Sequence, residues 1–197
     1  MKSAAGGYSA SMIRNVFVGL SGGVGTTTLT INYAFEKSQT LTIMLSDLDG
    51  KNPDIARALG LHRIEGRNEK ISKSLFASQG IPAPMQCDKF VFDLGSNIHH
   101  PILESADEIY LVSRIGFNTL ARLQELDLAP TALVINFADR TKAQIKWLSQ
   151  IEEAFPRLNI LRVPFDAKAF ESAAESKSAL IEIAANSLAR KSIATLG

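Results

Sequence analysis

Short apolar runs alternate with longer amphipathic stretches along most of the chain. The apolar runs have the length and composition of buried strands and predict strands at residues 16–18, 41–45, 89–93, 107–113, 131–136 and 159–163. Apolar residues at helical spacing predict helices at residues 26–37, 71–77, 114–128, 141–155 and 179–194. This alternation predicts an α/β fold, with a doubly wound, mainly parallel sheet and helices on both faces.

The length of the chain fits one domain with a well-buried core. Of its 197 residues, 46% are hydrophobic and 21% are charged, which is ordinary for a globular protein. Residues 1–12 are mostly small or polar, so we expect a flexible N-terminal tail followed by a single domain over residues 13–197. No apolar run approaches the ~20 residues that a membrane-spanning helix needs.

The charges of the chain are almost balanced. Lys and Arg together number 21 and Asp and Glu 20, which gives a net charge of +1. No overall field therefore attracts nucleic acid or an acidic membrane, and we predict no specific nucleic-acid partner. The single cysteine, Cys87, excludes an internal disulfide and fits a reducing compartment, and the N-terminus lacks the apolar core of a signal peptide. The expected location is cytoplasmic.

A glycine-rich loop joins the first predicted strand to the first predicted helix. The strand stops at Gly19, the loop contains Gly22, Gly23 and Gly25, and the helix begins at Thr26. Glycines let a loop turn its N–H groups inward, and the helix N-terminus behind them adds a partial positive charge. The order strand, glycine loop and helix therefore predicts a phosphate cradle.

Acidic and amide side chains end three of the predicted strands. Asp47 and Asp49 follow the second strand, and Asp93 ends the third, where open α/β sheets hold their ligands. Capping of a helix or turn is the alternative role for these carboxylates. Asn136 ends the fifth strand and is either a ligand contact or a simple turn residue.

The segment SGGVGTTT resembles the deviant Walker A motif K-G-G-x-G-K-[ST]-T of the MinD/ParA family of P-loop ATPases. Ser21 and Thr26 stand where the family has its two lysines, and Leu20 stands where an ordinary P-loop has its first glycine. Degenerate motifs of this kind are typical of the CpaE, TadZ and BcsQ members, which this chain resembles in overall shape. The continuation DLDGKNPDIARALGL is also similar to the CpaE type and lacks the D-x-D-P-Q-G-N of ParA partition proteins.

The resemblance implies a site for ATP and Mg²⁺. Its phosphate-binding residues would be Ser21, Gly22, Gly23, Val24, Gly25, Thr26, Thr27 and Thr28. Thr27, Asp47 and Asp93 would hold Mg²⁺, and Asp49 would orient the attacking water. Asn136 would contact the adenine ring, and the turn Pro164-Phe165-Asp166 would line the base pocket through Pro164 and Asp166.

Other features have simpler interpretations. His99 and His100 are expected on an exposed loop because no further ligands stand at metal-binding spacing. Trp147 is expected in the core. The terminal helix either packs through its broad apolar face, which we expect, or lies on anionic lipid; its polar side carries only two cations, Arg190 and Lys191.

Three functions fit these residues. The first is a degenerate MinD/ParA-like ATP-binding protein, a homodimer that acts as a spatial or assembly factor for a membrane-bound pilus, secretion or cellulose apparatus through protein partners. Binding of ATP would be weak and hydrolysis slow or absent, since one transition-state cation is worth on the order of 10³–10⁵ in rate. The second is an active ATPase in which Lys51, Arg114 or Arg140 supplies the missing charge. The third is a partition-type DNA-binding ATPase.

Overall fold

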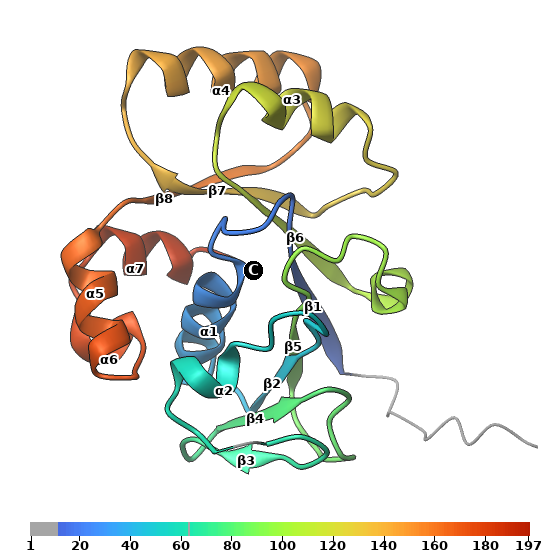
Figure 1. Ribbon diagram of the computed structural model, residues 1–197, viewed down its shortest axis with the longest axis vertical. Helices are drawn as coiled ribbons and strands as arrows, with labels where there is room; N and C mark the ends of the chain where they lie inside the picture. The colour runs from blue at the N-terminus through green and yellow to red at the C-terminus, as the bar shows by residue number, and fades with distance from the viewer. Residues whose placement is uncertain (1–11, 63) are drawn as a thin grey trace, which may run out of the picture.

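A computed structural model of the chain describes residues 12–62 and 64–197, so the predicted tail up to residue 11 lies outside the described residues. One eight-stranded sheet organises these residues, in the order β3-β4-β2-β5-β1-β6-β7-β8 (Figure 1). All neighbouring strands are parallel except β3 and β4, which confirms the predicted doubly wound α/β fold. The strands are β1 (Ile13–Gly19), β2 (Ile43–Asp47), β3 (Glu69–Lys70), β4 (Leu75–Gln79), β5 (Lys89–Asp93), β6 (Glu108–Ser113), β7 (Ala132–Ala138) and β8 (Ile160–Pro164).

Helices cover both faces of this sheet. Figure 1 shows α3 and α4 on one side of β6, β7 and β8, with α1, α5, α6 and α7 on the other side. The helices are α1 (Thr26–Lys37), α2 (Ile55–Ala58), α3 (Phe117–Gln124), α4 (Lys142–Ala154), α5 (Ala167–Glu175), α6 (Leu180–Ile183) and α7 (Leu188–Ala194), with a 3-10 helix at Pro101–Ser105. Among the described residues, no helix is long and apolar enough to cross a bilayer.

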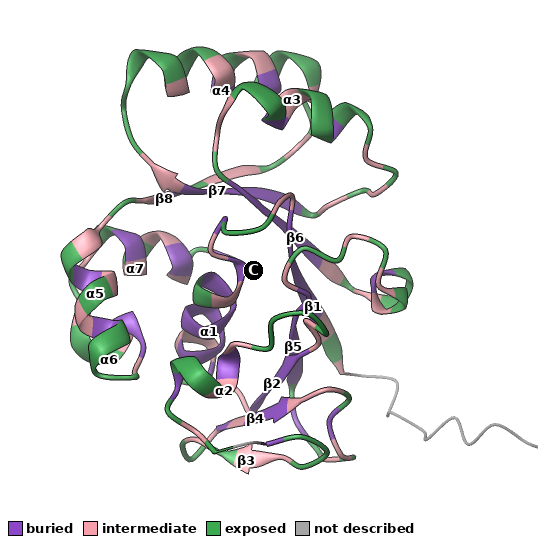
Figure 2. Ribbon diagram, in the orientation of Figure 1, coloured by how far each residue is buried: buried purple, intermediate pink, exposed green. Residues whose placement is uncertain are grey.

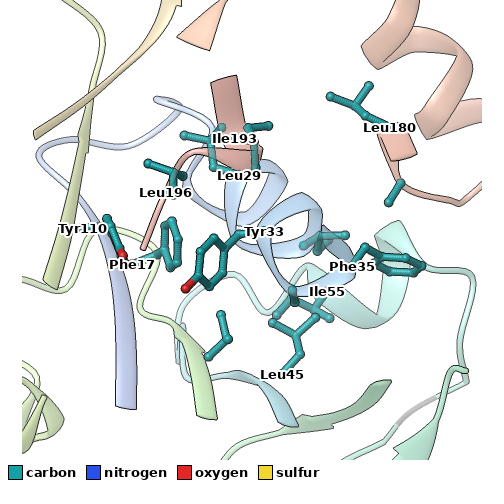
Figure 3. Close-up of a cluster of buried hydrophobic side chains, with 14 of the residues drawn as sticks. Phe17, Leu29, Tyr33, Phe35, Leu45, Ile55, Tyr110, Leu180, Ile193 and Leu196 are labelled. Atoms are coloured by element: carbon teal, nitrogen blue, oxygen red, sulfur yellow. The ribbon is translucent and has the colours of Figure 1, made fainter. Parts of the chain in front are cut away.

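Alternate residues of the strands other than β3 contribute to two separate cores, as expected for a sheet covered on both faces. On β1, Phe17 points to the α1 side while Val16 and Val18 point to the other side. Figure 3 shows the α1 side, where Tyr33 of α1 lies against Phe17 and Tyr110. Figure 2 shows that α1 is buried over much of its length, because the sheet and α7 cover it.

Two predicted helices are wrong or incomplete. Residues 71–77 form no helix, since Leu75–Gln79 is strand β4, which pairs in parallel with β2 and buries Leu75 and Ala77. The predicted helix over residues 179–194 is two short helices, and Ser187 starts the second by accepting a hydrogen bond from the N–H of Arg190 at 3.0 Å. The prediction also missed β3, α2 and α5.

Smaller differences concern the edges of the molecule. The helical part of residues 114–128 is limited to α3. Trp147 is half-buried rather than in the core, and its ring meets the ring of Phe117, which is 76% exposed, edge to face. The terminal helix α7 packs as predicted, because Ala189 and Ile193 are buried and Arg190 pairs with Glu36 of α1.

Candidate functional site: the glycine loop and its edge of the sheet

The glycine loop between β1 and α1 is held at its start and open at its middle. The N–H of Gly19 donates to the Gly95 carbonyl at 2.6 Å, and the N–H of Leu20 donates to the Val112 carbonyl at 2.8 Å. Gly23 and Gly25 have φ values of 71° and 87°, which favour glycine. Gly22 is exposed, and a side chain there would meet no atom within 4 Å, so the loop surface is unobstructed at this point.

The N–H groups of residues 21–28 form an unpaired row. Within the described part of the chain, none of them donates a hydrogen bond of normal geometry to another protein group, although the loop makes a turn at Gly22 and Gly23. They include the first turn of α1, whose N–H groups have no partner inside the helix and which carries the positive end of the helix dipole. Consecutive free N–H groups at a helix N-terminus are a site for an anion such as phosphate.

The two positions that carry lysines in the MinD/ParA motif contribute no cation. Thr26 is 6% exposed and its hydroxyl points back under the loop, 2.6 Å from where a Cβ on Gly19 would lie. Only the main-chain N–H of Thr26 is therefore available to a ligand. Ser21 is half-buried at the loop start and carries a neutral hydroxyl.

Asp47 and Asp93 end neighbouring parallel strands in the same register. Asp93 is fully buried; its Oδ1 accepts from the N–H of Gly95 at 3.0 Å, and its Oδ2 has no hydrogen-bond partner among the described residues. Burial raises the pKa of Asp93 to about 7, against the lowering effect of the Thr27 side chain. A buried carboxylate oxygen without a partner next to a threonine on the loop fits the outer ligand shell of Mg²⁺.

Both carboxylate oxygens of Asp47 accept hydrogen bonds from main-chain N–H groups. Its Oδ1 accepts from the N–H of Asp49 at 3.1 Å, and its Oδ2 accepts from the N–H of Ile55 at 2.9 Å. Burial is the main cause that raises the pKa of Asp47 to about 6. Its carboxylate therefore shapes the turn after β2, which is the capping role that the sequence left open.

Asp49 connects this turn to the turn after β5. Its Oδ1 accepts from the N–H groups of Lys51 at 3.0 Å and Asn52 at 3.2 Å. Its Oδ2 lies so close to Gly95 that a side chain at Gly95 would overlap with it. The structure thus places Asp47, Asp49 and Asp93 at the end of the sheet where the turns after β2 and β5 lie.

Asn136 holds the glycine loop from the other side. It is 2% exposed, its Nδ2 donates to the Val24 carbonyl at 2.9 Å, and its Oδ1 accepts from the N–H of Phe137 at 3.0 Å. The pairing of β7 with β8 is irregular between Ile135 and Ala138, and Phe137 has a φ of 54°. This bulge turns Asn136 toward the loop.

The predicted Pro164 and Asp166 lie beside this bulge. Pro164 ends β8 opposite Ala138, and the Asp166 carboxylate caps α5 by accepting from the N–H of Ala169 at 3.2 Å. Between them, Phe165 is 58% exposed and its ring centroid lies 5.4 Å from that of Phe137.

Of the cations that the sequence offered, Arg114 lies next to the loop, but the aromatic residue that holds it was not foreseen. The guanidinium carbon of Arg114 lies 4.0 Å from the centroid of the Phe137 ring, in cation–π contact. The sequence does contain a sign of this aromatic group, since an aromatic residue directly follows Asn136 and another directly follows Pro164. Sequence reasoning missed Arg122, whose Nη1 donates to the Leu20 carbonyl at 3.2 Å. Lys51, another candidate cation, contacts the Asp49 carboxylate through its main-chain N–H.

Protein side chains alone do not form a metal centre here. Among residues 12–62 and 64–197, no three His, Cys, Asp or Glu side chains are grouped so that they could hold one ion. His100 instead accepts a hydrogen bond from the N–H of Ile102 at 3.2 Å, and His99 is exposed, as expected for loop histidines. A Mg²⁺ ion at this edge would have to take phosphate oxygens and water in addition to Thr27 and the Asp93 side.

Comparisons with known proteins agree with this geometry at the level of the fold. No protein-family model matches the sequence, and a search of curated proteins finds no relative. A ParA family ATPase from Chlorobium tepidum TLS is similar in structure with a TM-score of 0.71 and 21% identity, over 94% of this chain and 97% of its own.

Two further solved structures are similar. The ATP complex of a point variant of Cyanothece McdA has a TM-score of 0.76 and 14% identity, covering 94% of this chain and 95% of its own. The septum site-determining protein MinD from Pyrococcus horikoshii OT3, complexed with Mg-ADP, has a TM-score of 0.70 and 14% identity over 93% of both chains. The chain therefore has the fold of the ParA and MinD ATPases, as its glycine loop predicted.

Proposed function

We propose that the chain is a degenerate ATP-binding protein of the MinD/ParA type, most similar in kind to CpaE, TadZ and BcsQ. The observation that carries this proposal is the row of unpaired N–H groups of residues 21–28 on an open loop. These groups supply the hydrogen bonds that a triphosphate needs even though Ser21 and Thr26 supply no charge. Loss of a charged contact weakens binding by roughly one to two decades and leaves the main-chain contacts in place.

The remaining site residues support the same proposal. Thr27 and Asp93 would hold Mg²⁺, whose charge would offset that of the phosphates. Asn136 would act on the nucleotide through the loop, because both of its polar groups are already bonded to protein. The Phe137–Phe165 pair offers an aromatic surface for the base next to Gly25.

Titration with ATP and Mg²⁺ tests the nucleotide site. Gly22→Asp places a carboxylate on the open loop, where an added Cβ meets no atom within 4 Å. We expect ATP to bind Gly22→Asp at least tenfold more weakly than the wild type, because like charges repel. Gly22→Asn is the matched neutral control and should bind within about threefold of the wild type. Equal affinity of all three proteins would contradict the proposal.

Hydrolysis should be very slow for a site without either lysine. One transition-state cation is worth on the order of 10³–10⁵ in rate, so we expect steady-state phosphate release close to background. An ordinary turnover that Arg114→Ala abolishes would instead favour an active ATPase with a substitute cation. Lys51→Ala is the parallel test of the second candidate cation.

The biological role that we propose is that of a spatial or assembly factor for a membrane-bound pilus, secretion or cellulose apparatus. The protein would be cytoplasmic and would reach the membrane through protein partners. The net charge of +1 argues against the alternative, a partition-type ATPase that binds nonspecific DNA. A salt-sensitive mobility shift on nonspecific duplex DNA would overturn this choice.

A further inference from the structure

A polar cavity of about 260 Å³ lies between the start of the glycine loop and α3. Its walls include Leu20 and Ser21 from the loop, Ser113 and Arg114 from the end of β6, and Asn118 and Arg122 from α3. The residues that line it include two arginines and no carboxylate. This balance of charge favours an anion in the cavity, which we call the arginine pocket.

Among the described residues, Arg114 and Arg122 have no acidic partner, and the Arg114 guanidinium lies over the Phe137 ring, 4.0 Å from its centroid, which leaves the N–H donors in its plane available. Three other arginines, Arg57, Arg162 and Arg190, each pair with a carboxylate. Arg122 uses one N–H on the Leu20 carbonyl and keeps other donors of its planar fork free.

The backbone around the arginine pocket is fixed by its own hydrogen bonds. The Arg114 carbonyl accepts from the hydroxyls of Ser113 at 2.8 Å and Thr119 at 3.0 Å. The Thr119 hydroxyl also accepts from the N–H of Gly116 at 3.0 Å. Because Arg122 bonds to Leu20, which in turn bonds to β6, the loop side and the helix side of the pocket are held together. Such an arrangement lowers the entropy cost of binding.

We propose that the arginine pocket binds a phosphate-class oxyanion between Arg114 and Arg122. The inference goes beyond the proposed function and does not depend on it, because the contacts come from side chains and not from the N–H groups of residues 21–28. The oxyanion is either free phosphate or a phosphate group of a nucleotide. In both cases the pocket restores positive charge beside Ser21, the position at which the MinD/ParA motif has its first lysine.

Titration of the ¹⁵N-labelled protein with inorganic phosphate, followed by NMR, tests the pocket. We expect shifts at Ser21, at Asn118 and at the Arg122 side chain. Arg122→Gln and the double variant R114Q/R122Q should weaken these shifts about tenfold or more, whereas Arg122→Lys keeps the charge and should bind within about threefold. Arg157→Gln, an exposed arginine that does not line the arginine pocket, is the matched control and should behave like the wild type.

The Gly22→Asp protein separates this pocket from the loop. If the inference is correct, phosphate still shifts the pocket residues in Gly22→Asp even if ATP binding is lost there, and Gly22→Asn shows how far the new carboxylate next to Ser21 weakens those shifts. Shifts confined to residues 22–28, or equal binding by the wild type and R114Q/R122Q, would overturn it. If Arg122→Gln weakens the binding of ATP more than the binding of AMP, the oxyanion in the pocket is a phosphate group of the nucleotide. If Arg122→Gln weakens the binding of inorganic phosphate and leaves ATP affinity unchanged, the oxyanion is free phosphate.

Discussion

Asp93 is a carboxylate whose charged form is strongly disfavoured by burial. It is fully buried, and its Oδ2 has no hydrogen-bond partner among the described residues. Burial raises its pKa to about 7 from an ordinary value near 3.8. A carboxyl whose pKa is raised in the folded state stabilises the protein below the unfolded pKa, and this contribution is lost as the pH rises through the folded pKa. The contribution of this carboxyl to the free energy of unfolding therefore falls between about pH 4 and pH 7.

Replacement of Asp93 by its neutral isostere tests this effect of burial. We expect Asp93→Asn to be more stable than the wild type at pH 8 by roughly 2–4 kcal/mol, from about 1.4 kcal/mol per unit of pKa. Below pH 4 the two proteins should have similar free energies of unfolding, since the wild-type carboxyl is then neutral. Urea denaturation at both pH values, with EDTA present, measures the difference. A pH-independent difference would contradict the assignment.

Gly95 is the second residue with a specific steric requirement. Its φ is 56°, and a side chain there would overlap with the Asp49 carboxylate. We expect Gly95→Ala to lower the free energy of unfolding by about 1–3 kcal/mol, through backbone strain and this overlap. Gly116→Ala is the control, because a side chain at Gly116 meets no atom within 4 Å. The double variant G95A/D49A should recover part of the loss, as thermal denaturation can show.

At the scale of elements, the bulge of β7 determines how the glycine loop is supported. The bulge lets Asn136 bond to the loop through Val24 and to the main chain of Phe137. We expect Asn136→Ala to destabilise the protein by about 1–3 kcal/mol, since it leaves a buried carbonyl without a partner. It should also weaken ATP binding and speed hydrogen exchange in the first turn of α1. Asn118→Ala, on exposed surface, is the control for stability.

The elements also show where sequence patterns succeed and fail. The strand and helix around the glycine loop were predictable, because apolar runs, glycines and the helix start all indicate the same structure. Strand β4 was not, since Leu75 and Ala77 fit either a helix or a strand until pairing with β2 decides between them. The break between α6 and α7 depends on Ser187, whose capping bond is a local detail that a broad apolar pattern hides.

At the scale of the whole molecule, the parallel strands place all candidate site residues at one edge of the sheet. The resemblance of the glycine loop to the MinD/ParA motif implies a homodimer, and we propose that a second copy would pair with the chain through this edge. In the MinD/ParA motif that the loop resembles, the first lysine reaches the nucleotide of the partner subunit; because Ser21 stands at that position here, we expect ATP with Mg²⁺ to shift the monomer–dimer equilibrium only weakly. Sedimentation velocity with ATP or ADP measures this shift, with Gly22→Asp as the control. A monomer that is unchanged at high protein and ATP concentration would contradict it.

The sequence by itself determined the glycine loop, the acids that follow it and the alternation of strands and helices, because each depends on local backbone and burial preferences. Only the tertiary structure decided which polar atoms remain available. It showed that Asp47 and Asn136 are bonded to protein, that the Thr26 hydroxyl points away from the loop surface, and that Arg122 reaches Leu20 across the fold. Such contacts join residues far apart in the chain, and their geometry arises from packing rather than from local pattern.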